Sequence, residues 1–150
     1  MTTPYVHDET VHNVQAANEI VPALIDIFHP HSVLDFGCGI GTFLSVFKRL
    51  GVNDVLGVDG PWVDQHMLDK YLASNEFLEA DLRHFVRMSR KFDLVISLEV
   101  AEHLDERHAD VFLDSITAAG DTIVFSAAIP GQGGQNHLNE QPLSYWIQKF

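Results

Sequence analysis

Three glycines at alternate positions, directly after an apolar run, constrain this chain more than any other feature. The stretch VLDFGCGIGTF covers residues 33–43, and its glycines are Gly37, Gly39 and Gly41. Glycine loses more backbone entropy on folding than any other residue and packs no side chain, so three of them beside a buried run indicate a backbone that something approaches closely. The stretch predicts a strand, a tight loop and a helix start, which is where α/β sheets bind ligands.

Strand-like runs alternate with helix-like segments along the rest of the chain. We expect strands at 32–36, 54–59, 76–81, 92–98 and 121–128. We expect helices at 8–28, 42–50, 63–72, 106–119 and 141–150. This alternation predicts an α/β fold with a doubly wound, mostly parallel sheet and helices on both faces.

The composition restricts the class of protein and its partners. The chain has 150 residues, a formal net charge of −12 and one cysteine, Cys38. The length indicates one domain, and a single cysteine excludes an internal disulfide or a cysteine zinc site. The negative charge disfavours nucleic acid and membrane surfaces, and leaves a small molecule as the expected substrate. The sequence shows neither a membrane-length apolar run nor a secretory signal, so we expect a cytoplasmic protein.

The spacing of the glycines separates two classes of cofactor. Dinucleotide sites prefer G-x-G-x-x-G, but this loop reads G-x-G-x-G and has Thr42 at the sixth position. Asp35 lies two residues before the first glycine, where a carboxylate repels a pyrophosphate and suits a cationic amino or sulfonium group. The loop therefore favours a nucleoside that carries an amino acid, and a tight turn without a ligand is the alternative.

Two further acids lie at the ends of the next two predicted strands. Asp59 lies 18 residues after Gly41, where a carboxylate can accept hydrogen bonds from both ribose hydroxyls. Asp81 ends the third predicted strand, where it can accept from an exocyclic adenine amine while Leu82 packs on the ring. Acids at three consecutive strand ends predict an adenosyl-binding site.

The order of these motifs resembles the class I S-adenosylmethionine-dependent methyltransferases. VLDFGCGIGTF, VLGVDG, EADLRHF and FDLVISLEVAEHL follow one another in the family's order, within about residues 30–130. The resemblance implies that the chain binds S-adenosylmethionine and its product S-adenosylhomocysteine, with Trp62 near the adenine. The residues that the resemblance assigns to the cofactor are Asp35, Gly37, Cys38, Gly39, Asp59, Gly60, Asp81, Leu82, Ser97 and Leu98.

The resemblance also sets expectations for the organisation of the domain. The family's sheet has seven strands in the order 3-2-1-4-5-7-6, and this sequence predicts only the five in the order 3-2-1-4-5. We expect strands 6 and 7 to be missing or replaced, which leaves an edge at strand five for a partner chain or a second copy. Within one domain, 1–150, we expect a helical lid (1–30), a cofactor-binding core (31–130) and the start of a substrate-side region (131–150).

The segment after the fourth predicted strand, LEVAEHL, carries the expected acceptor side. In a helical turn Glu99, Glu102 and His103 would share one face, and two carboxylates and an imidazole can bind a divalent cation. This E-x-x-E-H spacing resembles that of ubiquinone-pathway O-methyltransferases and small-RNA 2′-O-methyltransferases, where a metal binds and where a histidine comparable to His137 completes the RNA enzymes' site. We favour no metal: Glu99 contacts cofactor or substrate, and Glu102 and His103 cap and orient the next helix.

Methyl transfer requires positioning more than it requires a nucleophile, because the sulfonium donor is already activated. A base is needed when the acceptor is a hydroxyl or a protonated nitrogen. His137 follows the glycine-rich IPGQGGQN and is the expected base, with Glu99 and His103 as the other acceptor-side residues and Glu140 near them. We expect O-methylation of a small molecule. The alternatives are metal-assisted 2′-O-methylation of RNA and a cofactor-binding subunit without its own acceptor site.

Overall fold

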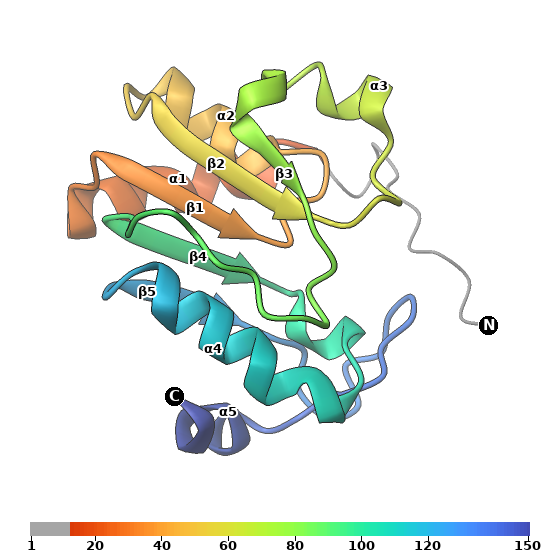
Figure 1. The fold of residues 1–150 in the computed structure, drawn as a ribbon. Helices are drawn as coiled ribbons and strands as arrows, with labels where there is room; N and C mark the ends of the chain where they lie inside the picture. The colour runs from red at the N-terminus through yellow and green to blue at the C-terminus, as the bar shows by residue number, and fades with distance from the viewer. Residues whose placement is uncertain (1–12) are drawn as a thin grey trace.

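The computed structural model describes residues 13–150, which form a five-stranded sheet with helices on both faces (Figure 1). The strand order is β3-β2-β1-β4-β5, and all four neighbouring pairs are parallel. This confirms the predicted fold class and strand order. The strands are β1 (Ser32–Phe36), β2 (Asp54–Asp59), β3 (Phe77–Glu79), β4 (Leu94–Leu98) and β5 (Ile123–Ser126).

The central strand, β1, sets the position of the ligand site. All five of its residues are buried, and Leu34 pairs with Leu56 of β2 on one side and with Val95 of β4 on the other. After β1 the chain therefore forms β2 and β3 on one side of β1. After β3 it crosses to the other side and forms β4 and β5. Such a reversal opens a crevice at the carboxyl ends of the strands, where ligands of α/β sheets bind.

Helices α1 (Gln15–Phe28) and α2 (Thr42–Arg49) cover one face of the sheet (Figure 1). Val21 of α1 and Phe47 of α2 are fully buried there, because both helices have apolar residues at three- and four-residue spacing. Of the predicted lid, residues 1–12 lie outside the described part of the chain, and residues 15–28 pack into this core. Among residues 13–150 no helix is long and apolar enough to cross a membrane; the cytoplasmic location stays a prediction.

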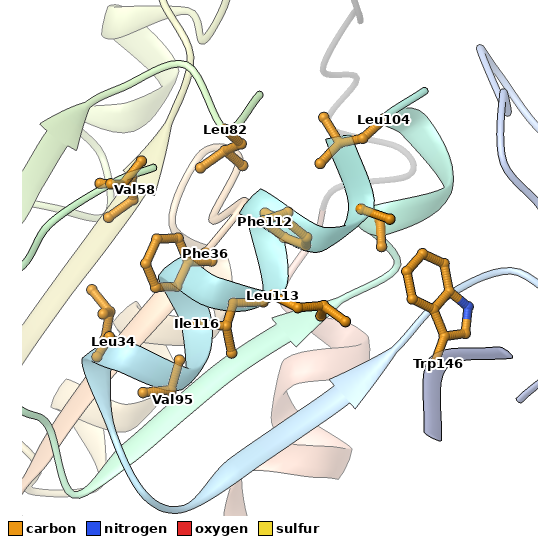
Figure 2. Packing of buried hydrophobic residues seen from close by; sticks show 14 of the residues in the cluster. Leu34, Phe36, Val58, Leu82, Val95, Leu104, Phe112, Leu113, Ile116 and Trp146 are labelled. Atoms are coloured by element: carbon orange, nitrogen blue, oxygen red, sulfur yellow. The ribbon is translucent and has the colours of Figure 1, made fainter. Parts of the chain in front are cut away.

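Helix α4 (Ala109–Ala119) covers the opposite face (Figure 2). Phe112 of α4 packs edge-on against Phe36 of β1, with ring centroids 6.3 Å apart and an interplanar angle of 86°. Such aromatic pairs add about 0.5–1.5 kcal/mol beyond the burial of their surface. Trp146 of α5 (Leu143–Lys149) closes the core next to Phe125 of β5.

Several elements are shorter than predicted. β3 ends at Glu79 rather than at residue 81, because it pairs with β2 alone and its last contact is the Ala80 amide on the Asp59 carbonyl. β4 begins at Leu94, since Phe92 forms only an isolated bridge. The predicted helix 63–72 is α3 (Gln65–Leu68), and the segment 106–119 starts as a 3-10 turn. The 3-10 turns are η1 (Ser74–Glu76), η2 (Ala101–His103) and η3 (Glu106–His108).

Candidate functional site

The glycine loop between β1 and α2 is pinned to the end of β2. The amides of Gly37 and Cys38 both donate to the carbonyl of Val58, over 2.7 and 3.2 Å. Gly37 has a φ of 83°, and a Cβ added to it would overlap both γ-methyl groups of Val100. A side chain at this position is excluded by backbone conformation and by packing. The loop therefore keeps its backbone at the carboxyl edge of the sheet.

Asp59 holds the loop from the neighbouring strand. Its Oδ2 accepts from the amide of Gly39 over 2.8 Å, and its Oδ1 accepts from the amide of Gly60 over 2.6 Å. The residue is only 6% exposed. The carboxylate at the end of β2 thus has a fixed place beside the glycine loop, and its contact with a ribose stays a prediction.

Asp35 brings a second buried carboxyl group to the same edge. The residue is 5% exposed in the central strand. Burial, and then the charge of Asp59, raise the pKa of Asp35 to about 8. Two acids in one buried region repel each other, and a cationic ligand stabilises the ionised form of both.

Two residues of the predicted cofactor set have their side chains in the core. The thiol of Cys38 is buried against Gly57 of β2, where a Cβ would lie 2.5 Å from its sulfur. Burial and the acids Asp35 and Asp59 raise the pKa of Cys38, so its thiol is inert at neutral pH. Leu82 is 3% exposed and packs in the cluster of α4 (Figure 2). Cys38 can therefore meet a cofactor through its backbone, and a role of Leu82 at the adenine stays a prediction.

Trp62 and Asp81 flank the predicted adenine side. The ring of Trp62 lies over Gly60, where a Cβ would overlap it, and the residue is 38% exposed. Asp81 lies in the turn after β3, which corrects its predicted place at the strand end. Its carboxylate accepts from Arg83 over 2.7 and 2.8 Å, and this pairing lowers the pKa of Asp81 to about 2. Its predicted contact with adenine competes with Arg83.

The predicted acceptor side lies after β4 and β5. Ser97 and Leu98 end β4, and the Ser97 hydroxyl is buried without a hydrogen-bond partner among residues 13–150. The turn η2 then brings Glu102 and His103 to His137, which comes from the loop after β5. One donor atom from each of these three residues lies within 4.8 Å of the other two. The rings of His103 and His137 meet edge to face, with centroids 5.0 Å apart.

Glu102 is the buried acid of this group. It is 0% exposed, and within the described part of the chain neither of its carboxylate oxygens has a hydrogen-bond partner. Burial, and then the charge of Glu99, raise the pKa of Glu102. Burial and His137 lower the pKa of His103. Both shifts favour the neutral forms of these two side chains.

Glu99 does not join this group, which corrects the expectation that Glu99, Glu102 and His103 share one face. Its φ of 55° turns the chain before η2 begins. Its Oε1 accepts from the hydroxyl of Ser126 over 2.8 Å, and its Oε2 accepts from Gln132 over 3.0 Å. The carboxylate of Glu99 is therefore tied to β5 and the loop that follows it.

The sequence predicted Glu140 near the acceptor-side residues, but not its contacts or those of Gln132. Glu140 binds His137 and two loop amides, and Gln132 links the loop to Glu99. The i, i+3 spacing of His137 and Glu140 in HLNEQ is a signal that could have indicated the first pair. Nothing local in the sequence indicates the contact between Gln132 and Glu99.

Comparisons with known proteins identify the family. Residues 9–125 match a family described as a methyltransferase domain, so the chain belongs to that family. The chain is 30% identical over 110 residues to the mitochondrial ubiquinone biosynthesis O-methyltransferase of Dictyostelium discoideum, which covers 63% of this chain and 34% of the relative. It is also 30% identical over 100 residues to the malonyl-[acyl-carrier protein] O-methyltransferase of Hamiltonella defensa, covering 66% and 38%. The chain thus spans about a third of the length of these relatives.

Solved structures share the fold. The plantazolicin methyltransferase BpumL in complex with SAH aligns with a TM-score of 0.69 at 17% identity, covering 94% of this chain and 64% of that chain. The methyltransferase domain of bacterial CtHen1-C aligns with a TM-score of 0.66 at 21% identity, covering 91% and 82%. At these identities the alignments support the architecture and leave the acceptor open.

Proposed function

We propose that this chain is a methyltransferase domain that binds S-adenosylmethionine and transfers its methyl group to a hydroxyl oxygen of a small molecule. The observation that supports this most is the pair of buried acids, Asp35 and Asp59, at the ends of β1 and β2 beside the glycine loop. A sulfonium or ammonium group relieves the repulsion of these acids, whereas a pyrophosphate increases it.

Different residues bind different parts of the cofactor. Asp35 and the backbone of the glycine loop face the cationic amino-acid part, and Asp59 accepts hydrogen bonds from the ribose hydroxyls. Gly60 and Trp62 lie on the adenine side. Ser97, with its buried hydroxyl, and Leu98 lie toward the transferred methyl group at the end of β4.

His137 is the residue we assign to the proton. The bound cofactor supplies a methyl group that is already activated by the positive sulfur. As the acceptor oxygen forms its bond to carbon, it must lose a proton, and an imidazole nitrogen can take it. Glu99, just after β4, and His103 in η2 face the acceptor, and Glu102 lies beside His103 in η2.

We infer the class of acceptor from the net charge of the chain and from its relatives. The net charge of −12 disfavours a polyanion such as RNA. The two curated relatives named above are O-methyltransferases of small or carrier-bound molecules. RNA 2′-O-methylation and a subunit that binds the cofactor without catalysis are the rival functions, and the edge at β5 is where a partner or second copy would pair.

A divalent cation fits one group of residues. Glu102, His103 and His137 offer one oxygen and two nitrogens, a donor set that divalent metals accept, and the buried Glu102 carboxylate lacks a hydrogen-bond partner in the described part of the chain. When bound, a cation would lower the pKa of an acceptor hydroxyl. A metal would occupy the nitrogen that the base needs, so the two roles of His137 exclude each other. Titration with Mg²⁺ and Mn²⁺ against a chelator separates them.

Calorimetry tests the proposal directly. We expect S-adenosylmethionine and S-adenosylhomocysteine to bind and NAD not to bind, because the loop disfavours a pyrophosphate. The Asp59→Asn variant should lose most of this affinity. Asp54→Asn, at the opposite end of β2, is the matched control. Equal binding of NAD, or no binding of either adenosyl compound, would overturn the proposal.

A further inference from the structure

We propose that Glu140 is a positioning residue for His137: it holds the imidazole in the tautomer that carries its proton on Nδ1, so that Nε2 offers a lone pair. The catalytic meaning of this inference rests on the proposed function, in which His137 accepts a proton. The tautomer itself follows from contacts within the chain and can be tested without a cofactor or an acceptor.

Three hydrogen bonds converge on the Glu140 carboxylate. Its Oε1 lies 2.8 Å from Nδ1 of His137 and accepts from the amide of Gly133 over 2.6 Å. Its Oε2 accepts from the amide of Gly131 over 2.8 Å. The side chains of Glu140 and His137 are only 19% and 12% exposed, so water competes little for this pair.

The direction of the histidine bond follows from the chemistry of its partners. Backbone amides can only donate, so both oxygens of Glu140 act as acceptors. Hydrogen bonds from backbone amides to both oxygens favour the ionised form, so Glu140 is a carboxylate. An ionised carboxylate has no proton to donate, so Nδ1 must donate and carries the proton. In a neutral imidazole, the other nitrogen, Nε2, is then the acceptor.

The carboxylate is itself held by the turn that surrounds it. Gly131 and Gly133 have φ values of 85° and 69°, and this left-handed backbone turns both amides toward Glu140. The other end of the segment is fixed by the amides of Leu138 and Asn139, which both donate to the Glu102 carbonyl in η2. The first part of the loop, at Gly131 and Gly133, is thus bound to the Glu140 carboxylate. The later part, at Leu138 and Asn139, is bound to η2, the turn that carries His103.

The packing of the ring completes the orientation. His137 lies over Gly134, where a Cβ would overlap its Nε2 edge, and it meets the ring of His103 edge to face. Glycine at 134 leaves room for the imidazole ring, which lies where a side chain would begin. With Nδ1 engaged by Glu140, Nε2 is the nitrogen that can offer a lone pair, and one ring nitrogen of His137 lies within 4.8 Å of a ligand atom of Glu102 and of His103. A carboxylate that orients a histidine in this way is a recurring arrangement in catalytic and metal sites.

The test is the tautomer of His137, measured by long-range proton–nitrogen correlation on histidine labelled with ¹⁵N, at a pH where the ring is neutral. We expect the unsubstituted protein to hold the proton on Nδ1. Glu140→Gln should shift the tautomer ratio by about tenfold or more, because a hydrogen bond to a charged acceptor is replaced by one to a neutral amide. Glu140→Asp keeps the charge and should keep the ratio closer to that of the unsubstituted protein.

Two controls separate positioning from loop structure. Gln132→Ala removes the side-chain contacts of the loop with Glu99 and with the Ile129 amide and retains the Glu140 carboxylate, so the tautomer should not change. Glu79→Gln replaces an exposed acid in β3 and should change nothing at His137. A proton on Nε2 in the unsubstituted protein overturns the inference without any variant. An unchanged ratio in Glu140→Gln, or an equal change in Gln132→Ala, overturns it as well.

The outcome is independent of whether the proposed function holds. If S-adenosylmethionine fails to bind but the proton is on Nδ1, the proposed function is wrong and the positioning of His137 stands. If the cofactor binds and the proton is on Nε2, the proposed function stands and the positioning of His137 is wrong. In Glu140→Gln the cofactor affinity should stay within about twofold, because Glu140 lies on the acceptor side. Once an acceptor is known, this variant should lower kcat and alter its pH profile without a matching change in KM.

Discussion

The two halves of the site are built in different ways. On the cofactor side, the glycine loop binds backbone to backbone to Val58, and a single carboxylate, Asp59, fastens it to the next strand. On the acceptor side, the contacts run between side chains and loop amides: Glu99 with Ser126 and Gln132, and Glu140 with its loop.

Few substitutions can therefore change the arrangement of the cofactor side, whereas many can change the arrangement of the acceptor side. The cofactor side consists of short segments at the ends of β1 and β2, and buried strands fix their positions. The acceptor side joins three segments that are distant in sequence, at 99–103, 126 and 132–140. Methyltransferases use one donor and many acceptors, and this division of the site fits that requirement.

The largest effect is expected where the two halves touch. Gly37→Ala should lower the free energy of unfolding by about 2–5 kcal/mol, from backbone strain and from overlap with Val100. Urea denaturation measures this. Gly51→Ala, with a φ of 101° and no atom within 4 Å of the added Cβ, carries only the strain and should lose about 1–2 kcal/mol. The double variant with Val100→Ala should recover part of the difference, and no recovery would mean that the overlap is not the cause.

The next effect isolates the cofactor side. Asp59→Asn should weaken the binding of S-adenosylmethionine by about 10–100-fold, because it replaces a charged acceptor and disturbs the contacts to Gly39 and Gly60. Calorimetry gives the dissociation constant. Asp54→Asn lies on the same strand in an exposed pair with Arg90 and should change stability by less than about 0.5 kcal/mol and affinity not at all. Similar losses in both variants would contradict the assignment.

A third prediction concerns pH. Because the pKa of Asp35 is raised to about 8, the free protein binds a proton there that a cationic ligand must displace. Affinity for S-adenosylmethionine should rise with pH by up to about tenfold per unit below pH 8 and then level off. The unfolded chain loses this proton above about pH 4, so the free energy of unfolding should fall as pH rises from 4 to 8.

Calorimetry in two buffers that differ in ionisation enthalpy measures the protons released on binding, and chemical denaturation measures the stability. In Asp35→Asn the pH dependence of the affinity should disappear, and the fall in stability should become smaller. A pH-independent affinity in the unsubstituted protein would show that Asp35 is already ionised before the cofactor binds.

The smallest effect lies on the acceptor side. Glu102→Met should raise the free energy of unfolding by about 1 kcal/mol, because it replaces a buried carboxyl group without a partner by an apolar group of similar shape. Since burial raises the pKa of Glu102, the stability of the unsubstituted protein falls as pH rises above the ordinary value of 4.5, and the gain should be larger at pH 8 than at pH 5. Urea denaturation at both pH values checks this, with the exposed Glu106→Met as control. Destabilisation would reveal a partner for the carboxylate.

The sequence predicted the parts that depend on local pattern. The five strands and the glycine loop follow from apolar runs separated by glycines, whereas the strand order follows from the resemblance to the class I methyltransferases. Asp59 was placed correctly because it ends a buried strand. The end of β3 was wrong, since an edge strand with one neighbour stops where that neighbour's ladder stops, and the sequence does not show this.

The acceptor side was predicted less well for a physical reason. The direction of Glu99 depends on a backbone φ of 55°, which a non-glycine residue adopts only when its surroundings enforce it. The meeting of Glu102, His103 and His137 depends on how a loop returns across two strands. Only the pair of His137 and Glu140 has a local signal, because three residues separate them.

The place of the single cysteine gives this domain a built-in reporter. The thiol of Cys38 lies beneath the glycine loop, closed off by Gly57, so a reagent can alkylate it only during moments when that loop opens. The rate of alkylation under native conditions therefore measures the local opening equilibrium of the cofactor side, separately from global unfolding. A ligand that rests on the loop protects the thiol in proportion to its occupancy, which turns one buried sulfur into a screen for compounds that bind there.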